Sequence, residues 1–145
     1  MPPAESVAIV FAFPPCTDTA VSGAWKFKEK GLSAIIKALQ LFERAVKISE
    51  NAKAPYMIEN PVSTISTYWR KPDHIIQPWM YGDLYTKKTC LWIGNNFKMP
   101  EVHYSEKPDG VKKNYMLSFS PTDDRRDLRA VTPMGFAEAV FESNN

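Results

Sequence analysis

Two short apolar segments on either side of one strong helical pattern constrain the fold of this chain more than any other feature. The first segment, residues 7–13, reads as a strand buried on both faces, and the second is 56–58. Between them, apolar residues recur at helical spacing over about 32–51. A strand, a helix and a strand in this order form a βαβ unit, whose two strands are parallel. The sequence therefore predicts an α/β fold.

The rest of the chain adds shorter elements. Residues 74–77 and 89–93 are predicted strands, and 134–142 is a predicted helix with Phe136, Ala139 and Val140 as its buried face. The segment 95–131 carries many charges and is interpreted as an irregular insert. With 145 residues, of which 44% are hydrophobic, a single domain over 1–145 is expected. The sheet is predicted to be mostly parallel, with about four or five strands and flanking helices.

Two reactive side chains follow the paired strands. Pro14 and Pro15 end the first strand beside Cys16, and Glu59 follows the second. Because parallel strands open at the same edge of a sheet, the thiol and the carboxylate are expected to face one crevice.

Cys16 has two possible roles. Its thiolate is a potential nucleophile if the pKa is lowered, and Thr17, Lys26 and Lys28 are close in sequence. A buried, inert thiol is an equally weighted alternative. The other cysteine, Cys90, falls inside a predicted strand and is expected to be part of the core.

Glu59 also allows two interpretations. A carboxyl group at a strand end could hydrogen-bond the ring nitrogen and the exocyclic amine of a heterocycle. It could equally brace the loop, whose turn is fixed by Asn60 and Pro61.

Several classes of function are excluded. His74 and His103 have no ligand spacing, so no metal is expected, and the H-x-E and P-C-x-x-C motifs of zinc deaminases are absent. The six glycines form no phosphate-binding or dinucleotide-binding loop. The two cysteines lack the paired spacing of a disulfide framework. The sequence also shows no signal peptide and no apolar stretch of membrane-spanning length. It therefore predicts a soluble cytoplasmic protein.

Cations and aromatic residues are mixed in two places. One is the segment Tyr68 to Lys71, and the other is Lys87 and Lys88 near Trp79 and Tyr85. Such surfaces contact nucleotides by phosphate pairing and base stacking. A solvated basic face with its aromatic residues packed inward is the alternative. The net charge of +2 is too small to indicate nucleic-acid binding by itself.

These motifs resemble those of a known family. Residues 13–16 resemble the Pro-Cys loop of DNA cytosine-5 methyltransferases, and 59–62 resemble their Glu-Asn-Val motif. Residues 81–94 are similar to the family's Tyr-Gly, Gln-x-Arg-x-Arg and strand pattern. In that pattern Tyr85 stands at the Gln position, and Lys87 and Thr89 stand at the two Arg positions. Residues 129–133 resemble its Arg-x-Leu-Thr-x-Arg block.

A compact branch of methyltransferase-like proteins in phage and prophage sequences is more similar still. Its motifs are P-P-C-T with S-G, E-N-P, and Q-P-W followed by T-K-x-T-C-L-W. They are matched here by 14–17, 22–23, 59–61, 77–79 and 86–92.

The resemblance implies a covalent mechanism on a partial Rossmann-like methyltransferase fold. The Cys16 thiolate would add to C6 of a cytosine flipped from the duplex, while Glu59 contacts N3 and the amino group. C5 would then take a methyl group from S-adenosylmethionine. The matching positions imply further substrate contacts, which would come from Pro15, Thr17, Asn60, Tyr85, Lys87 and Thr89.

The chain departs from the family in three respects. The first strand already leads to Cys16, so the N-terminal half that would bind S-adenosylmethionine is missing. Residues 95–128 replace a much larger recognition region, and Tyr85, Lys87 and Thr89 alter the DNA-contact positions. The missing half would leave a sheet edge open, so a homo-oligomer or a partner chain on that edge is expected.

Two other functions stay open. One is a catalytically degenerate phage module that binds nucleotide, DNA or a host protein, for example in counter-defence. The other is an amino-methyltransferase, because Pro14 and Pro15 resemble the Asp-Pro-Pro-Tyr loop of that family. Phe13 and Cys16 replace both diagnostic residues of the loop, so this class ranks last.

Overall fold

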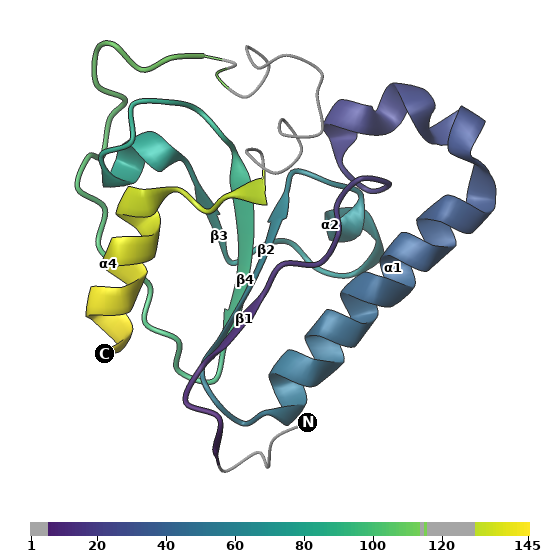
Figure 1. Cartoon of the computed structure of the whole chain (residues 1–145), viewed down its shortest axis with the longest axis horizontal. Helices are drawn as coiled ribbons and strands as arrows, with labels where there is room; N and C mark the ends of the chain where they lie inside the picture. The colour runs from purple at the N-terminus through teal and green to yellow at the C-terminus, as the bar shows by residue number, and fades with distance from the viewer. Residues whose placement is uncertain (1–5, 114, 116–129) are drawn as a thin grey trace. The chain divides into compact units, whose positions relative to one another are not determined.

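The computed structural model describes residues 6–113, 115 and 130–145, and the chain divides into two compact units. The first unit comprises Met1–Ile75 and Thr89–Phe97, and the second comprises Ile76–Lys88 and Lys98–Asn145. Figure 1 shows the elements of both units along the chain. None of the helices among these described residues is long and apolar enough to cross a membrane.

Four strands form one mixed sheet. They are β1 (Val10–Ala12), β2 (Tyr56–Pro61), β3 (His74–Ile76) and β4 (Thr89–Gly94), in the spatial order β1-β2-β4-β3. As predicted, β1 and β2 are parallel, but β2 and β4 are antiparallel.

The prediction of a mostly parallel sheet is therefore wrong. A parallel pair needs a long crossover, usually a helix, and only the segment between β1 and β2 contains a long one. The connection after β2 holds only the four-residue helix α2 (Ile65–Tyr68). Without a crossover helix, β4 returns alongside β2 in the opposite direction.

β1 differs from its prediction in both length and burial. It has only three residues and is a terminal strand of the sheet. One face, with Val10 and Ala12, packs against the core, but Phe11 is 43% exposed and Phe13 is 51% exposed. The expectation of a strand buried on both faces is wrong, because the core covers the face with Val10 and Ala12 and leaves the face with Phe11 partly exposed.

The long helix α1 (Phe27–Asn51) lies along the sheet of the first unit (Figure 1). Its side chain Phe42 packs with Ile58 and Trp92 in the core, and Leu39 and Val46 pack against this cluster. The helix begins earlier than predicted, because one helical turn precedes a kink at Gly31.

The segment before α1 is also more ordered than the expected loop. It contains the 3-10 helix η2 (Val21–Lys26), which leads directly into the first turn of α1.

The second unit is built on two helices. They are η3 (Pro78–Tyr81) and α4 (Met134–Asn144), whose rings Tyr81 and Phe136 lie 5.0 Å apart. The Gly135 N–H donates a hydrogen bond to Asp83 at 2.9 Å, which ties the start of α4 to the segment after η3. Phe136, Ala139 and Val140 are buried, as predicted.

The segment predicted to be irregular, 95–131, is described only in part. Its described residues are 95–113, 115, 130 and 131; those up to 115 form no strand of the sheet and no α-helix, whereas Ala130 is helical. Residues 114 and 116–129 lie outside the described residues, and with them part of the predicted insert and Arg129 of the last motif.

Candidate functional site

The loop after β1 places Cys16 at the start of a tight turn. The Cys16 carbonyl accepts hydrogen bonds from the backbone N–H groups of Thr19 at 3.1 Å and Ala20 at 2.8 Å. The Thr19 hydroxyl donates to the same oxygen at 3.3 Å. Cys16 is half-buried, and its thiol forms no disulfide. The backbone of the residue is therefore fixed while its side chain remains partly accessible.

β2 carries the second predicted residue, Glu59, inside the strand rather than after it. Ala12 pairs with Ile58, so the chain leaves β1 level with Glu59 on the neighbouring parallel strand. Glu59 itself lies opposite Leu91 of β4 and is half-buried. The strand extends to Pro61 because β4 pairs with it, which the sequence of β2 alone does not reveal.

Asn60 joins the two motifs directly. Its side-chain amide donates a hydrogen bond of 3.0 Å to the buried carbonyl of Pro14, across 46 positions of sequence. The side chain is 1% exposed, so this bond is shielded from water. Asn60 therefore fixes the Cys16 loop to the strand that carries Glu59, and we call Cys16, Glu59 and Asn60 the strand-end site.

A second connection lies just beyond it. Ala20 and Ser63 form an antiparallel bridge. Two hydrogen bonds flank it, from Val21 N–H to the Val62 carbonyl and from Thr64 N–H to the Thr19 carbonyl, both at 3.0 Å. The loops after β1 and β2 are thus held together beyond the strands.

Two polar atoms in this region lack a partner. Among the described residues, nothing hydrogen-bonds to the buried Asn60 Oδ1 or Thr64 Oγ1. Buried polar groups are normally satisfied, so both atoms are candidates to bind ordered water.

The other predicted contacts are divided between the two units. Pro15 and Thr17 are exposed in the Cys16 loop, and Thr89 is buried opposite Pro61 at the same end of β2. The structure therefore brings Pro15, Thr17 and Thr89 to the strand-end site.

Tyr85 and Lys87 belong to the second unit. The Tyr85 ring lies 5.1 Å from that of Tyr115, and burial, with the nearby Asp83 and Tyr115, raises the pKa of Tyr85 to about 12. The Lys87 ammonium donates to the Val131 carbonyl at 2.9 Å. Both side chains thus have partners within their own unit.

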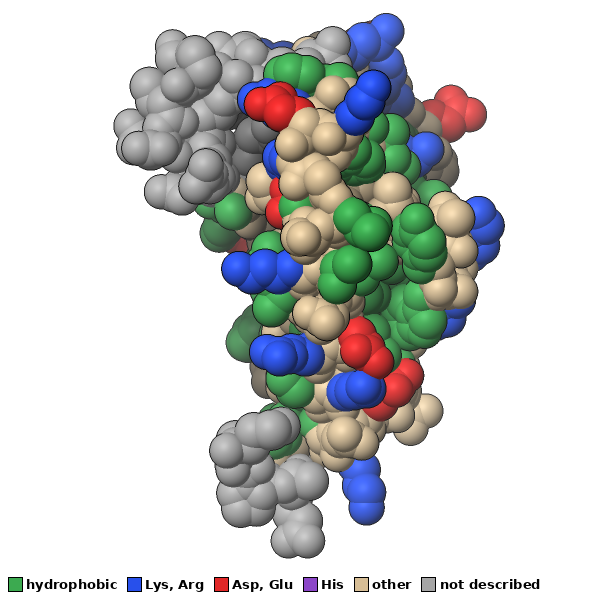
Figure 2. Space-filling view, turned by 90° about the vertical axis from the view of Figure 1, so that its right-hand side faces the viewer, with side chains coloured by type: hydrophobic (Ala, Val, Ile, Leu, Met, Phe, Trp, Pro, Cys, Tyr) green, Lys and Arg blue, Asp and Glu red, His purple; other side chains and the backbone are tan. Residues whose placement is uncertain are grey.

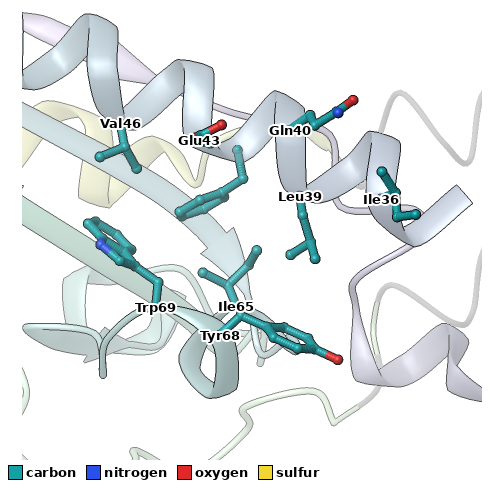
Figure 3. A pocket seen from close by; sticks show the side chains of 9 residues that line it. Ile36, Leu39, Gln40, Glu43, Val46, Ile65, Tyr68 and Trp69 are labelled. Atoms are coloured by element: carbon teal, nitrogen blue, oxygen red, sulfur yellow. The ribbon is translucent and has the colours of Figure 1, made fainter. Parts of the chain in front are cut away.

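A separate apolar groove lies between α1 and α2. Its volume is about 380 Å³, and it is lined by Ile36, Leu39, Gln40, Phe42, Glu43, Val46, Ile65, Tyr68 and Trp69. Figure 3 shows Leu39 of α1 pointing toward Ile65 and Tyr68 of the α2 segment. In Figure 2, which views the molecule from the side of α1, hydrophobic side chains gather in one area between charged ones.

The aromatic and basic segment at the end of α2 serves packing. Trp69 contacts Phe42 and Trp92 at centroid distances of 5.6 and 5.9 Å. The Arg70 guanidinium stacks on Trp69, 4.7 Å from its centroid, and binds Asp73 at 2.7 Å. Trp69 therefore packs one side against the core while 38% of it stays exposed, and Tyr68 is 67% exposed, so the segment fits neither interpretation completely.

The turns after β1 and β2 do not offer a glycine-bearing loop for S-adenosylmethionine. No glycine lies in the turns after β1 and β2, where the Cys16 loop and Pro61 stand instead, so the close backbone approach of a cofactor-binding loop is lacking there. The structure also contains no cluster of metal-binding side chains within the part of the chain that it describes.

No protein-family model, curated protein or solved structure matches this chain. Its function therefore has to be argued from the strand-end site itself.

Sequence reasoning missed one feature of this site. Lys30 binds the loop at Thr17 and Asp18, with its Nζ 3.1 Å from the Thr17 carbonyl and 2.5 Å from the Asp18 carboxylate. The available signal was Gly31, which predicts a break in the helical pattern directly after this lysine.

Proposed function

We propose that this chain is the nucleophile-bearing part of a DNA cytosine-5 methyltransferase-like enzyme. The observation that carries the proposal is the Asn60–Pro14 hydrogen bond, which fixes a thiol loop to the strand of a carboxylic acid. The parallel pairing of β1 and β2 supports it, since β1 ends level with Glu59 on the neighbouring strand.

The proposed chemistry begins with addition. The Cys16 thiolate forms a bond to C6 of cytosine, and the electrons of the C5–C6 double bond move toward N3. A protonated Glu59 donates its proton to N3 and accepts a hydrogen bond from the amino group. C5 becomes an enamine carbon, which takes up an electrophile. Water then takes the C5 proton, the electrons of that C–H bond re-form the C5–C6 double bond and expel the thiolate, and N3 returns its proton to Glu59, which restores the ring and the acid.

S-adenosylmethionine is the methyl donor in the family that the motifs resemble. Because the turns after β1 and β2 offer no glycine-bearing loop for it, we propose that the cofactor site would come from a separate chain. The proposed role of this chain is to bind the base and activate C5.

This role is testable without a methyl donor. In D₂O, the activated C5 takes a deuteron instead of a methyl group, so elimination leaves deuterium on the cytosine. We expect the protein to catalyse this exchange in a single-stranded DNA oligonucleotide, measured by mass spectrometry. Cys16→Ser and Glu59→Gln should abolish the exchange, while Cys90→Ser, which changes the other thiol, should retain it. Absence of exchange with folded protein would contradict the proposal.

A non-catalytic binding module is the second candidate, and the apolar groove favours it. In that case Cys16→Ser would bind nucleotide, DNA or the partner protein as strongly as the wild type, while Tyr68→Asp would bind it more weakly. Tyr68 is 67% exposed at the groove, so the substitution should leave the fold intact.

A further inference from the structure

We propose that Lys30 is a positioning residue that holds the Cys16 loop through Thr17 and Asp18. Its ammonium binds two adjacent groups of the loop, the Thr17 carbonyl and the Asp18 carboxylate. Both groups lie within two positions of Cys16, so the lysine acts on the thiol through the backbone that carries it.

The contact depends on the kink in α1. Gly31 has a φ of 76° and a ψ of 177°, which separates residues 27–30 from the rest of the helix. Lys30 is the last residue before this break, and it returns to a loop 12 positions earlier in the chain. Lys26 and Lys28 of the same segment are exposed, whereas the side chain of Lys30 is only 27% exposed.

The rest of the loop is fixed by other bonds. Asn60 holds it at Pro14, and the Thr64 N–H holds it at the Thr19 carbonyl. The stretch between these two points contains Cys16, Thr17 and Asp18. Lys30 binds in that stretch directly after Cys16, whose own carbonyl accepts hydrogen bonds from Thr19 and Ala20, so its release would loosen the loop on the C-terminal side of the thiol.

The inference rests on the proposed function in one respect, that Cys16 is the reacting group. The test needs no substrate, because the alkylation rate of a thiol reports its accessibility and its thiolate fraction. Cys90, which is 3% exposed, is an internal reference for general loosening of the fold.

The experiment measures alkylation of Cys16 by iodoacetamide at neutral pH, with peptide mass spectrometry to separate the two cysteines. Lys30→Met and Asp18→Asn should each speed alkylation of Cys16 by about two- to fivefold, as expected for loss of a half-exposed ion pair. Lys30→Arg should restore the wild-type rate. Lys28→Met, at an exposed lysine two positions away, is the matched control and should have no effect.

Three results would overturn the inference. The first is an unchanged rate in Lys30→Met. The second is opposite changes in Lys30→Met and Asp18→Asn, because the pair would then act on the thiol through charge and not through position. The third is parallel labelling of Cys90, which would indicate loss of stability. If the wild-type protein catalyses no deuterium exchange but Lys30→Met still speeds alkylation of Cys16, the proposed function is overturned and the positioning role of Lys30 stands.

Discussion

At the scale of single residues, Asn60 is the side chain on which the strand-end site depends most. Replacing it with Ala leaves the buried Pro14 carbonyl without its donor, which costs about 1–3 kcal/mol of unfolding free energy. Asn60→Asp should cost more, because it also buries a carboxyl group that is an acceptor when ionised. Urea unfolding measures both variants.

The matched control for this prediction is Asn51→Ala, at an exposed asparagine that ends α1. Its unfolding free energy should stay within about 0.5 kcal/mol of the wild type. A similar loss in both variants would show that the amide of Asn60 has no special role.

Asp73 gives a prediction about pH. Burial alone would raise the pKa of Asp73, but hydrogen bonds from Arg70 and from the Ile93 N–H outweigh this effect and lower it below the usual 3.8. A lowered pKa in the folded state stabilises the protein above pH 3.8, and this contribution is lost as the pH falls through the folded value.

The corresponding variant is Asp73→Asn. Its deficit in unfolding free energy relative to the wild type should be present at neutral pH and should shrink as the pH falls below 3.8. Chemical denaturation over a series of pH values measures this difference. A deficit that does not change with pH would show that the ionised carboxylate of Asp73 does not stabilise the fold.

At the scale of elements, the kink in α1 connects the helix to the candidate site. An added Cβ at Gly31 would meet nothing within 4 Å, but the φ of 76° is strained for any other residue. Gly31→Ala should therefore cost about 1–3 kcal/mol, or straighten the helix and carry Lys30 away from the loop. If the helix straightens, alkylation of Cys16 should become faster, because Lys30 no longer holds the loop.

Gly110→Ala is the matched control for the kink. Gly110 has a φ of 81° and also has nothing within 4 Å of the added Cβ, so its backbone strain is similar. Its substitution should lower stability without changing the Cys16 rate. Equal rates of Cys16 alkylation in the two variants would show that the kink at Gly31 does not affect the thiol.

The elements that the sequence predicts well are those with a strong local pattern. Residues 74–76, 89–93 and 134–142 are strand, strand and helix as expected, because alternation and helical spacing are local properties. The direction of β4 and the length of β2 depend on pairing between distant segments, which no local pattern contains. β1 is shorter than predicted because it pairs with β2 over three residues only, and the extent of pairing is not a local property.

In the candidate site too, some features could be predicted from the sequence and others could not. The parallel direction of β1 and β2, the strands next to Cys16 and Glu59, could be predicted because the βαβ rule fixes it. The Asn60–Pro14 bond and the Lys30–Asp18 pair could not, because each joins side chains through geometry that appears only after folding.

At the scale of the whole molecule, the open edge of the sheet predicts association. The Val10 N–H donates to Pro55 on the β2 side, so the N–H and carbonyl of Phe11 point to the other side of β1. No strand of the described residues pairs with β1 on that side. Edges of this kind bind further strands, and the partly exposed ring of Phe13 adds apolar surface beside this one. We therefore expect a homodimer or larger assembly in the absence of a partner chain.

Light scattering over a range of protein concentrations measures this association. The wild-type mass should rise with concentration, and Phe13→Lys should shift the protein toward the monomer, because a charge beside an edge strand opposes strand addition. Phe141→Lys is the matched control, since Phe141 is 68% exposed on α4 and belongs to no strand. Its mass should follow the wild type. A wild-type protein that stays strictly monomeric, or an equal response of both variants, would show that the edge of β1 is not the surface through which this chain associates.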